Sequence, residues 1–343
     1  MASAVQAEAK EPDLRSDHQP VEPNTDIAID TSDDDIESFD SDTSTSIASS
    51  VFNYKYENGR RYHAYRAGEY LLPNDEKEQD RLDLLHHIFR MTLGGELYRA
   101  PLPSNPQRIL DFGTGTGIWA IDIADEFPSS EVIGTDLSPI QPTWIPPNCK
   151  FYVDDVESEW PYQPGEEFDF IHGRGMGGSI ANWDQLYERA YQHLKPGGWI
   201  EMQEYETDVH SDDNSLDNAR LIKKFQRVGD EASAKFGKQF NVAGTHKQRL
   251  IDAGFVNVKD DVYKIPIGSW PKDPKMKKLG CYQLVQVLSS LEPFMMALYT
   301  RVMGYTVEET EVLIAGVRAE FKDPKNHLYS QFHFIHGQKP MET

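Results

Sequence analysis

The sequence is poor in cysteine and in long apolar runs, and each shortage excludes a class of protein. Its two cysteines, Cys149 and Cys281, cannot build a disulfide framework and favour a reducing compartment. No apolar run approaches the roughly 18 residues of a membrane-spanning helix, and the N-terminus lacks the charged and apolar regions of a secretion signal. We therefore expect a cytoplasmic or nuclear protein that is not secreted and does not enter a membrane.

Positive charge is also scarce, because 34 Lys and Arg residues face 56 Asp and Glu residues and leave a formal net charge of −22. A chain this acidic repels phosphates, which argues against direct binding of nucleic acid. The metal-binding patterns H-E-x-x-H and paired C-x-x-C are missing, as is the nucleophile elbow of serine hydrolases. The sequence therefore predicts no metal site.

The negative charge is concentrated at the N-terminus. Residues 1–50 hold 13 acidic residues, two basic residues and a single aromatic, Phe39, and they carry half of the net charge. Such a segment buries too little apolar surface to offset its ordering entropy, so we expect a disordered tail. Its serines could accept phosphate, or the tail could bind a basic partner, but a solubilising role requires neither.

The most informative stretch is Ile109–Trp119, in which an apolar pair precedes Asp111 and three glycines at alternate positions. This pattern predicts a buried strand, a tight glycine turn and then a helix. A second strand ends at Asp136, 19 residues after Gly117, where a carboxylate can accept hydrogen bonds from two ribose hydroxyls. An NAD site is the alternative, but its G-x-G-x-x-G spacing differs from the Asp-x-Gly-x-Gly-x-Gly found here.

Two further motifs follow in order. Phe151–Val156 predicts a third strand that ends in two aspartates, although such residues alone could be solvated turn residues. Glu167–Arg174 predicts a fourth strand, and Leu194–Ile200, with the sequence Leu-Lys-Pro-Gly-Gly-Trp-Ile, turns into a fifth. Together the motifs resemble those of class I S-adenosylmethionine-dependent methyltransferases. The resemblance implies an α/β fold with a Rossmann-like seven-stranded sheet, helical cap insertions, an antiparallel last strand over Tyr329–Gly337, and S-adenosyl-L-methionine as cofactor.

The same resemblance implies a cofactor-binding set. The acidic residue and the glycine loop would meet the methionine end of the cofactor, Asp136 its ribose, and Asp155 with the next amide its adenine. The expected cofactor-binding residues are Asp111, Gly113, Gly115, Gly117, Asp136, Leu137, Asp155, Val156 and Arg174.

A sulfonium methyl group is already activated, so the protein chiefly aligns the acceptor and excludes water. A base helps when the acceptor is a hydroxyl or a protonated amine. At the carboxyl ends of the fourth and fifth strands we expect His172 as that base and Glu204 as a holder of a substrate amine. Packing of His172 beneath the sheet edge is the alternative.

A narrower resemblance lies in the aromatic and basic block Tyr54–His87, which contains Glu57–Tyr65, Glu69–Glu76 and Glu78–Asp83. This block is similar to the LaeA-like methyltransferases of filamentous fungi, a family of velvet-associated nuclear regulators and biosynthetic enzymes. The resemblance implies methylation of a small-molecule acceptor at O, N or C in fungal secondary metabolism. The alternatives are a regulator in a complex with a velvet-type protein partner, or a protein methyltransferase. The block itself either packs on the core or contacts ligands directly.

The expected organisation is an acidic disordered tail over 1–50, N-terminal lid helices over 51–100, and a methyltransferase domain over 101–343 with cap insertions at about 205–245 and 268–325. A deep apolar pocket beside the cofactor would favour a small-molecule enzyme. A flat exposed patch would favour the regulator, and an open acidic groove the protein methyltransferase. The helices expected from apolar spacing run from about 73 to 97 and over 183–194, 218–236, 247–253, 279–303 and 307–321.

Overall fold

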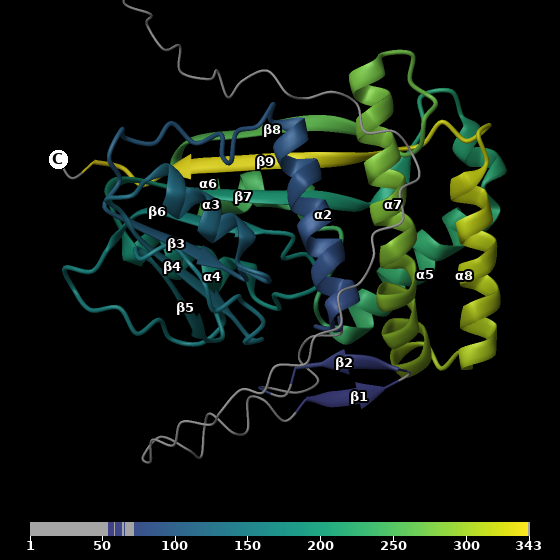
Figure 1. Ribbon diagram of the computed structural model, residues 1–343, viewed down its shortest axis with the longest axis horizontal. Coiled ribbons are helices and arrows are strands. Elements are labelled where there is room, and N and C mark those ends of the chain that lie inside the picture. The colour runs from purple at the N-terminus through teal and green to yellow at the C-terminus, as the bar shows by residue number, and fades with distance from the viewer. Residues whose placement is uncertain (1–53, 58, 64, 66–71, 342–343) are drawn as a thin grey trace, which may run out of the picture. The chain divides into compact units, whose positions relative to one another are not determined.

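A seven-stranded sheet organises the computed structural model, which describes residues 54–57, 59–63, 65 and 72–341. The strands lie in the order β5-β4-β3-β6-β7-β9-β8; the first five are parallel, and β9 runs antiparallel to both of its neighbours. This confirms the expected α/β fold and its antiparallel last strand (Figure 1). The strands are β3 (Arg108–Phe112), β4 (Glu131–Asp136), β5 (Cys149–Val153), β6 (Phe168–Arg174), β7 (Leu194–His210), β8 (Val256–Pro266) and β9 (Tyr329–Gln338).

Helices cover both faces of the sheet. On one face Ile109 of β3 packs against α3 (Ile118–Glu126), and the adjacent Leu110 faces α4 (Trp183–His193) and α6 (His246–Asp252) on the other. This alternation is what the two-residue period of a strand requires. The helix α2 (Glu76–Thr92) lies over the β9 end of the first face, where its Phe89 contacts Phe332 and Phe334.

A second hydrophobic cluster lies beyond the sheet and forms the cap. Its helices are α5 (Arg220–Phe236), α7 (Pro274–Ala297) and α8 (Val307–Lys322), and a π-helical turn over Leu298–Val302 continues α7. Figure 1 shows these helices side by side at one end of the molecule. Met295 and Met296 are buried in this cluster, so they serve as core residues.

Several boundaries differ from those predicted. The helix α2 ends at Thr92 instead of near residue 97, because Gly94 and Gly95 adopt positive φ angles of 70° and 105° that stop a helix. The helix α7 begins five residues before the predicted start, at Pro274, since Asp273 caps it by accepting a bond from the Met276 amide at 2.8 Å.

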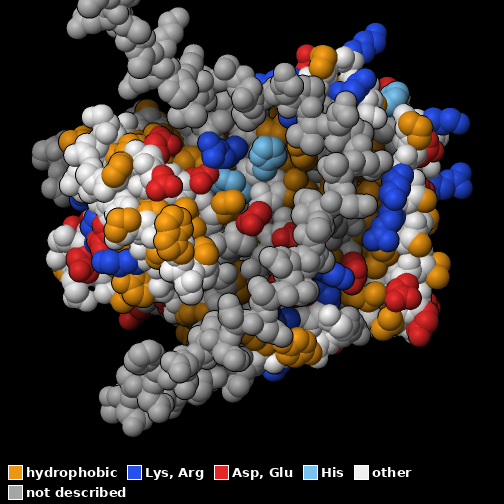
Figure 2. Space-filling view, in the orientation of Figure 1, with side chains coloured by type: hydrophobic (Ala, Val, Ile, Leu, Met, Phe, Trp, Pro, Cys, Tyr) orange, Lys and Arg blue, Asp and Glu red, His pale blue; other side chains and the backbone are white. Residues whose placement is uncertain are grey.

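The described part of the predicted lid region, 51–100, contains one helix and a short antiparallel hairpin of β1 (Lys55–Glu57) and β2 (Arg60–Tyr62). The predicted acidic tail, 1–50, lies outside the described residues. Among the described residues, no helix is both long and apolar enough to span a membrane, and no group of His, Cys, Asp and Glu side chains is arranged to hold a metal ion. On the face drawn in Figure 2, acidic and basic side chains are interspersed among the described residues.

Candidate active site

The glycine loop connects β3 to α3 at the carboxyl edge of the sheet. Gly113, Gly115 and Gly117 have φ angles of 62°, 58° and 80°, which only glycine adopts without strain. A Cβ at Gly115 would meet nothing nearer than Leu82, at 3.4 Å, whereas a Cβ at Gly113 would collide with Met176. The backbone at Gly115 is therefore open to an adjacent pocket, whereas the loop packs tightly at Gly113 and Gly117.

Asp136 ends β4 and closes the loop from beside. Its Oδ2 accepts a hydrogen bond from the Gly115 amide and its Oδ1 one from the Ser138 amide, each at 2.8 Å. Each carboxylate oxygen retains a second lone pair that can accept a hydroxyl. Burial raises the pKa of Asp136 to about 6. The carboxyl group is therefore mostly ionised at neutral pH, although water solvates it poorly.

An outer pocket of about 890 Å³ opens beside Asp136. Asp155 lines it, but its Oδ1 already accepts the Glu157 amide at 2.9 Å, so the carboxylate also shapes its own turn. Seven of the expected cofactor-binding residues line this pocket: Gly113, Gly115, Asp136, Leu137, Asp155, Val156 and Arg174.

An inner pocket of about 620 Å³ shares the glycine loop and Arg174 with the outer pocket and adds Asp111. Asp111 Oδ1 lies 2.8 Å from His172 Nδ1, and the His172 ring stacks on Trp119 with centroids 3.6 Å apart. His172 is fully buried, and that burial lowers its pKa despite Asp111. It lines neither pocket; it lies behind Asp111 and orients that carboxylate.

Arg174 supplies a half-buried cation to the lining of both pockets. Its Nη1 donates to His86 Nδ1 at 3.0 Å, and His86 Nε2 lies 3.1 Å from Asp122 Oδ2. Burial lowers the pKa of His86 to about 4, so the imidazole is neutral and its Nε2 carries the proton donated to Asp122. Burial also lowers the pKa of Arg174, to about 10, which still leaves the guanidinium charged at neutral pH.

Glu204, the second candidate for catalysis, supports the loop that follows β6. Its Oε1 accepts the Met176 amide at 2.7 Å and its Oε2 the Gly177 amide at 3.4 Å. Burial raises the pKa of Glu204 to about 8. The residue is 2% exposed and lines neither the outer nor the inner pocket, so it reaches a ligand there only through the backbone it holds.

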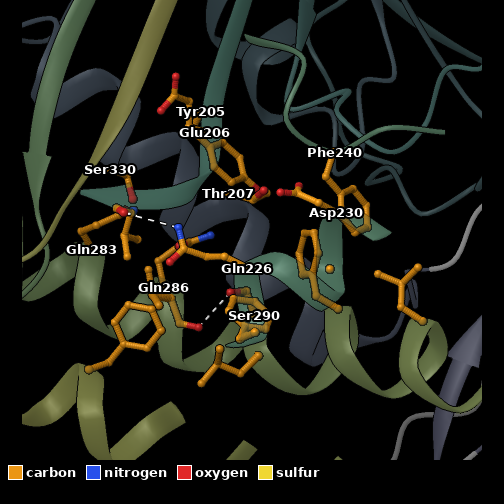
Figure 3. A pocket seen from close by; sticks show the side chains of 18 of the residues that line it. Tyr205, Glu206, Thr207, Gln226, Asp230, Phe240, Gln283, Gln286, Ser290 and Ser330 are labelled. Carbon is orange, nitrogen blue, oxygen red and sulfur yellow. Dashed lines mark hydrogen bonds between the residues drawn. The ribbon is translucent and has the colours of Figure 1, made fainter. Parts of the chain in front are cut away.

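A third pocket of about 690 Å³, the cap pocket, lies between the end of β7 and the cap helices α5 and α7. Most of its lining is apolar and aromatic (Figure 3). Tyr205 and Phe294 line both the cap pocket and the inner pocket. The two pockets are therefore neighbours that share these two side chains as a common wall.

Eight of the nine expected cofactor-binding residues thus line the two glycine-loop pockets. Gly117 does not; it begins α3 in a left-handed conformation. Sequence reasoning missed the buried Glu78–Arg81 ion pair of α2, joined at 2.6 Å, although its i, i+3 spacing was a signal. It also missed Phe294, which carries no signal, because an aromatic in an apolar helix resembles any core residue.

A contribution of α2 to the site is clear from the same two pockets. Glu78 lines the outer pocket, Arg81 the inner pocket, and Leu82 lines both. The first two turns of α2 therefore form one wall over the glycine loop, and Thr116 of that loop donates a hydrogen bond to Asp83 at 2.7 Å.

Comparison with known proteins places these pockets in context. Residues 69–259 match the model of a family described as a methyltransferase domain. The chain is 43% identical over 308 residues to methyltransferase pytC of Aspergillus terreus, covering 89% of this chain and 94% of that protein. It is 39% identical to the secondary metabolism regulator LAE1 of Cochliobolus heterostrophus, covering 83% of this chain and 95% of that protein.

A further relative is the protein-methionine methyltransferase laeA of Emericella nidulans. It is 36% identical to this chain, and the alignment covers 83% of this chain and 76% of that protein. Among solved structures, a Haemonchus contortus phosphoethanolamine N-methyltransferase 2 in complex with S-adenosyl-L-methionine aligns at a TM-score of 0.41 and 19% identity. That alignment covers 76% of this chain and 52% of the other, and it is too distant to support an argument about function.

Proposed function

This chain belongs to the LaeA-like S-adenosylmethionine-dependent methyltransferases of fungi, and we propose that its acceptor is a small molecule of secondary metabolism that binds in the cap pocket. One observation carries the proposal: the cap pocket meets the inner pocket at Tyr205 and Phe294. A concave, mostly apolar pocket next to the cofactor pockets suits a small molecule better than a flat protein surface would.

The residues at the sheet edge fit the cofactor. The open backbone at Gly115 leaves room for close approach of a ligand, and Asp136 keeps free lone pairs for ribose hydroxyls. We assign the adenosine part to the outer pocket, with Asp155 and Val156 beside the adenine. We assign the amino-acid part to the inner pocket, where the Arg174 guanidinium offers a partner for its carboxylate.

When bound, the cofactor supplies an activated methyl group, so the protein acts mainly by alignment and exclusion of water. In the proposed mechanism Tyr205 and Phe294 shield the junction at which the acceptor atom meets that methyl group. We assign positioning roles to His172 and Glu204, because neither lines a pocket. His172 orients Asp111, and Glu204 fixes the backbone at Met176 and Gly177.

Two measurements test the proposal in sequence. Calorimetric titration with S-adenosylmethionine and S-adenosylhomocysteine, with NADH as control, should show binding of the first two alone. The protein is then incubated with methyl-labelled S-adenosylmethionine and a fungal lysate, and the organic extract is separated from the protein fraction. We expect label in the organic extract. Label confined to protein would instead establish a protein methyltransferase.

A second function, as a regulator in a protein complex, is favoured by the names of the LAE1 and laeA relatives. The exposed apolar residues Trp144, at 91% exposure, and Tyr152, on the edge strand β5, could contact such a partner. If the protein acts as a regulator in such a complex, Trp144→Ser should weaken the binding of the partner protein and leave the affinity for S-adenosylmethionine unchanged. Co-purification of the full chain with a velvet-type protein, compared between wild type and this variant, tests it.

A further inference from the structure

The cap pocket also defines a class of acceptor. Building on the proposed function, we infer that the acceptor is an elongated, mainly apolar molecule, uncharged or cationic, that presents a hydrogen-bond donor to Gln283 at the end of the pocket remote from the cofactor. The donor is a hydroxyl or an amine N–H group. Three features of the pocket carry this inference: its length along α7, an unpaired buried oxygen, and the sign of its charge.

The length follows from the face of α7 that lines the pocket. Its lining positions recur every three or four residues, which is one side of a helix. They run from Gln283 to Phe294, eleven positions and roughly 16 Å along the axis at 1.5 Å per residue. Phe294 also lines the inner pocket, so Gln283 lies at the end of this α7 face remote from that pocket. Leu298 and Tyr299, on the turn that continues α7, line the cap pocket beyond Phe294. The α7 residues that line the pocket are Gln283, Gln286, Val287, Ser290, Leu291 and Phe294.

Gln283 provides the unpaired atom. Its side chain is 1% exposed and lines the pocket, and its Oε1 has no hydrogen-bond partner among the described residues. Figure 3 shows Gln283 and Ser330 on the side of the pocket opposite Asp230 and Phe240. A buried carbonyl oxygen without a donor is costly. A ligand hydroxyl or amine at this point would remove that cost, whereas an ether or a carboxylate would not.

The charge of the pocket excludes acids. No Lys, Arg or His is among the residues that line it, while Glu206 and Asp230 are. Glu206 is paired outside the pocket, with His210 Nε2 at 2.6 Å and His333 Nε2 at 3.4 Å. Asp230 lies at the mouth and accepts only the Asn241 amide, at 2.8 Å, from the described residues. An anionic acceptor would enter past this carboxylate and find no cation inside.

The side chains that line the middle of the cap pocket account for the apolar body that we infer for the acceptor. Between Gln283 and the junction with the inner pocket, Val287 and Leu291 of α7 line it, and the rings of Phe225, Phe240 and Tyr299 add to the apolar lining. Phe240 packs against Phe294 with ring centroids 5.4 Å apart. The acceptor therefore carries its methylated atom at one end and its recognised donor at the other.

Four matched probes with the same phenylhexyl body test the inference. The full-length protein, saturated with S-adenosylhomocysteine, is titrated with 6-phenylhexan-1-ol, its methyl ether, 6-phenylhexan-1-amine and 6-phenylhexanoate. The alcohol and the amine should bind. The ether, which has no donor, should bind about tenfold more weakly, since one hydrogen bond to a buried acceptor is lost. The carboxylate should bind more weakly still. Equal binding of all four probes would overturn the inference.

A variant locates the effect. Gln283→Leu should abolish the preference of the alcohol over the ether, whereas Gln248→Leu, on the exposed side of α6, should retain it. An unchanged preference in Gln283→Leu, with an unchanged melting temperature, would show that the donor is recognised elsewhere and would contradict the inference. The methyl-labelling experiment separates this outcome from a failure of the proposed function, because that failure would place the label in the protein fraction instead of the organic extract, whereas a donor recognised elsewhere would leave the label in the organic extract.

Discussion

The glycine-loop pockets and the cap pocket meet at Tyr205 and Phe294, yet they are built in opposite ways. The first are made mainly from strand ends and tight turns, and they present backbone groups, carboxylates and the guanidinium groups of Arg81 and Arg174. The second is made mainly from helix faces and presents mostly apolar side chains, with a few amides and hydroxyls, two carboxylates and no basic residue. The fold can therefore hold one cofactor by its topology while helix surfaces change to suit different acceptors.

The largest test of this division is loss of the carboxylate at the end of β4. Asp136→Ala removes the acceptor for two loop amides and for ribose hydroxyls, so S-adenosylmethionine affinity should fall by at least about 100-fold. Calorimetry measures it. Asp125→Ala, an exposed change on α3, should leave the affinity unaltered. Retained affinity in a folded Asp136→Ala protein would place the cofactor elsewhere.

The next effect concerns the pH dependence of stability on the sheet side. Glu204 has a pKa of about 8 in the folded protein, against about 4.3 in an unfolded chain. Between these values the folded state binds the extra proton, so the free energy of unfolding should fall as pH rises from 5 to 8. On the order of 2 kcal/mol of that fall should disappear in Glu204→Gln.

Chemical denaturation at several pH values measures this slope. Glu188→Gln, an exposed change on α4, should keep the slope of the wild type. If Glu204→Gln also kept it, the carboxyl would be ionised throughout that range, and the 175–177 turn would rest on a charged support.

How much the sequence could predict differs between the two regions. Local patterns predicted the succession of strands along the chain, the turn at Gly113–Gly117, and the positions of Asp136 and Arg174. They could do so because each of these residue types is needed where a strand ends or a turn requires it. Burial was harder to foresee. His172 was expected near the carboxyl end of the fourth strand, but it lies inside β6, where its ring contacts Trp119 and Asp111.

The cap pocket escaped prediction for a physical reason. Its walls come from β7, α5, α7 and β9, segments separated by up to 125 residues between Tyr205 and Ser330. The apolar spacing of α5 and α7 predicts that their faces are covered, but a helix face that lines a cavity has the same pattern as one that packs in a core. Gln283 and Gln286, two buried amides on an apolar face, were the available signal.

A smaller change fills the cap pocket and leaves the other pockets alone. Val287 lines it, so Val287→Trp should reduce binding of 6-phenylhexan-1-ol about tenfold through steric exclusion. S-adenosylhomocysteine affinity should stay within about twofold. Val285→Trp, on the 54% exposed side of the same helix, is the matched control and should affect neither ligand. If Val287→Trp weakened the binding of both ligands, the shape of the cofactor pockets would depend on the packing of the cap pocket.

The smallest effect asks whether the cap opens separately from the sheet. At the start of α8, Thr306 Oγ1 accepts the Glu309 amide at 3.1 Å and the Glu309 side chain accepts the Thr306 amide at 2.9 Å. Thr306→Ala should cost about 1 kcal/mol. Because α8 packs in the cap cluster, hydrogen exchange should quicken about fivefold over 307–322 and stay unchanged in β3 and β6.

The control is Thr143→Ala, in an exposed loop, which should leave both regions as they are. If the cap unfolds by itself, weakening its helix start lowers only the cost of that local opening. If exchange quickens equally in α8 and in the strands, cap and sheet unfold together, and a change of acceptor pocket would then have to preserve the stability of the cofactor site as well.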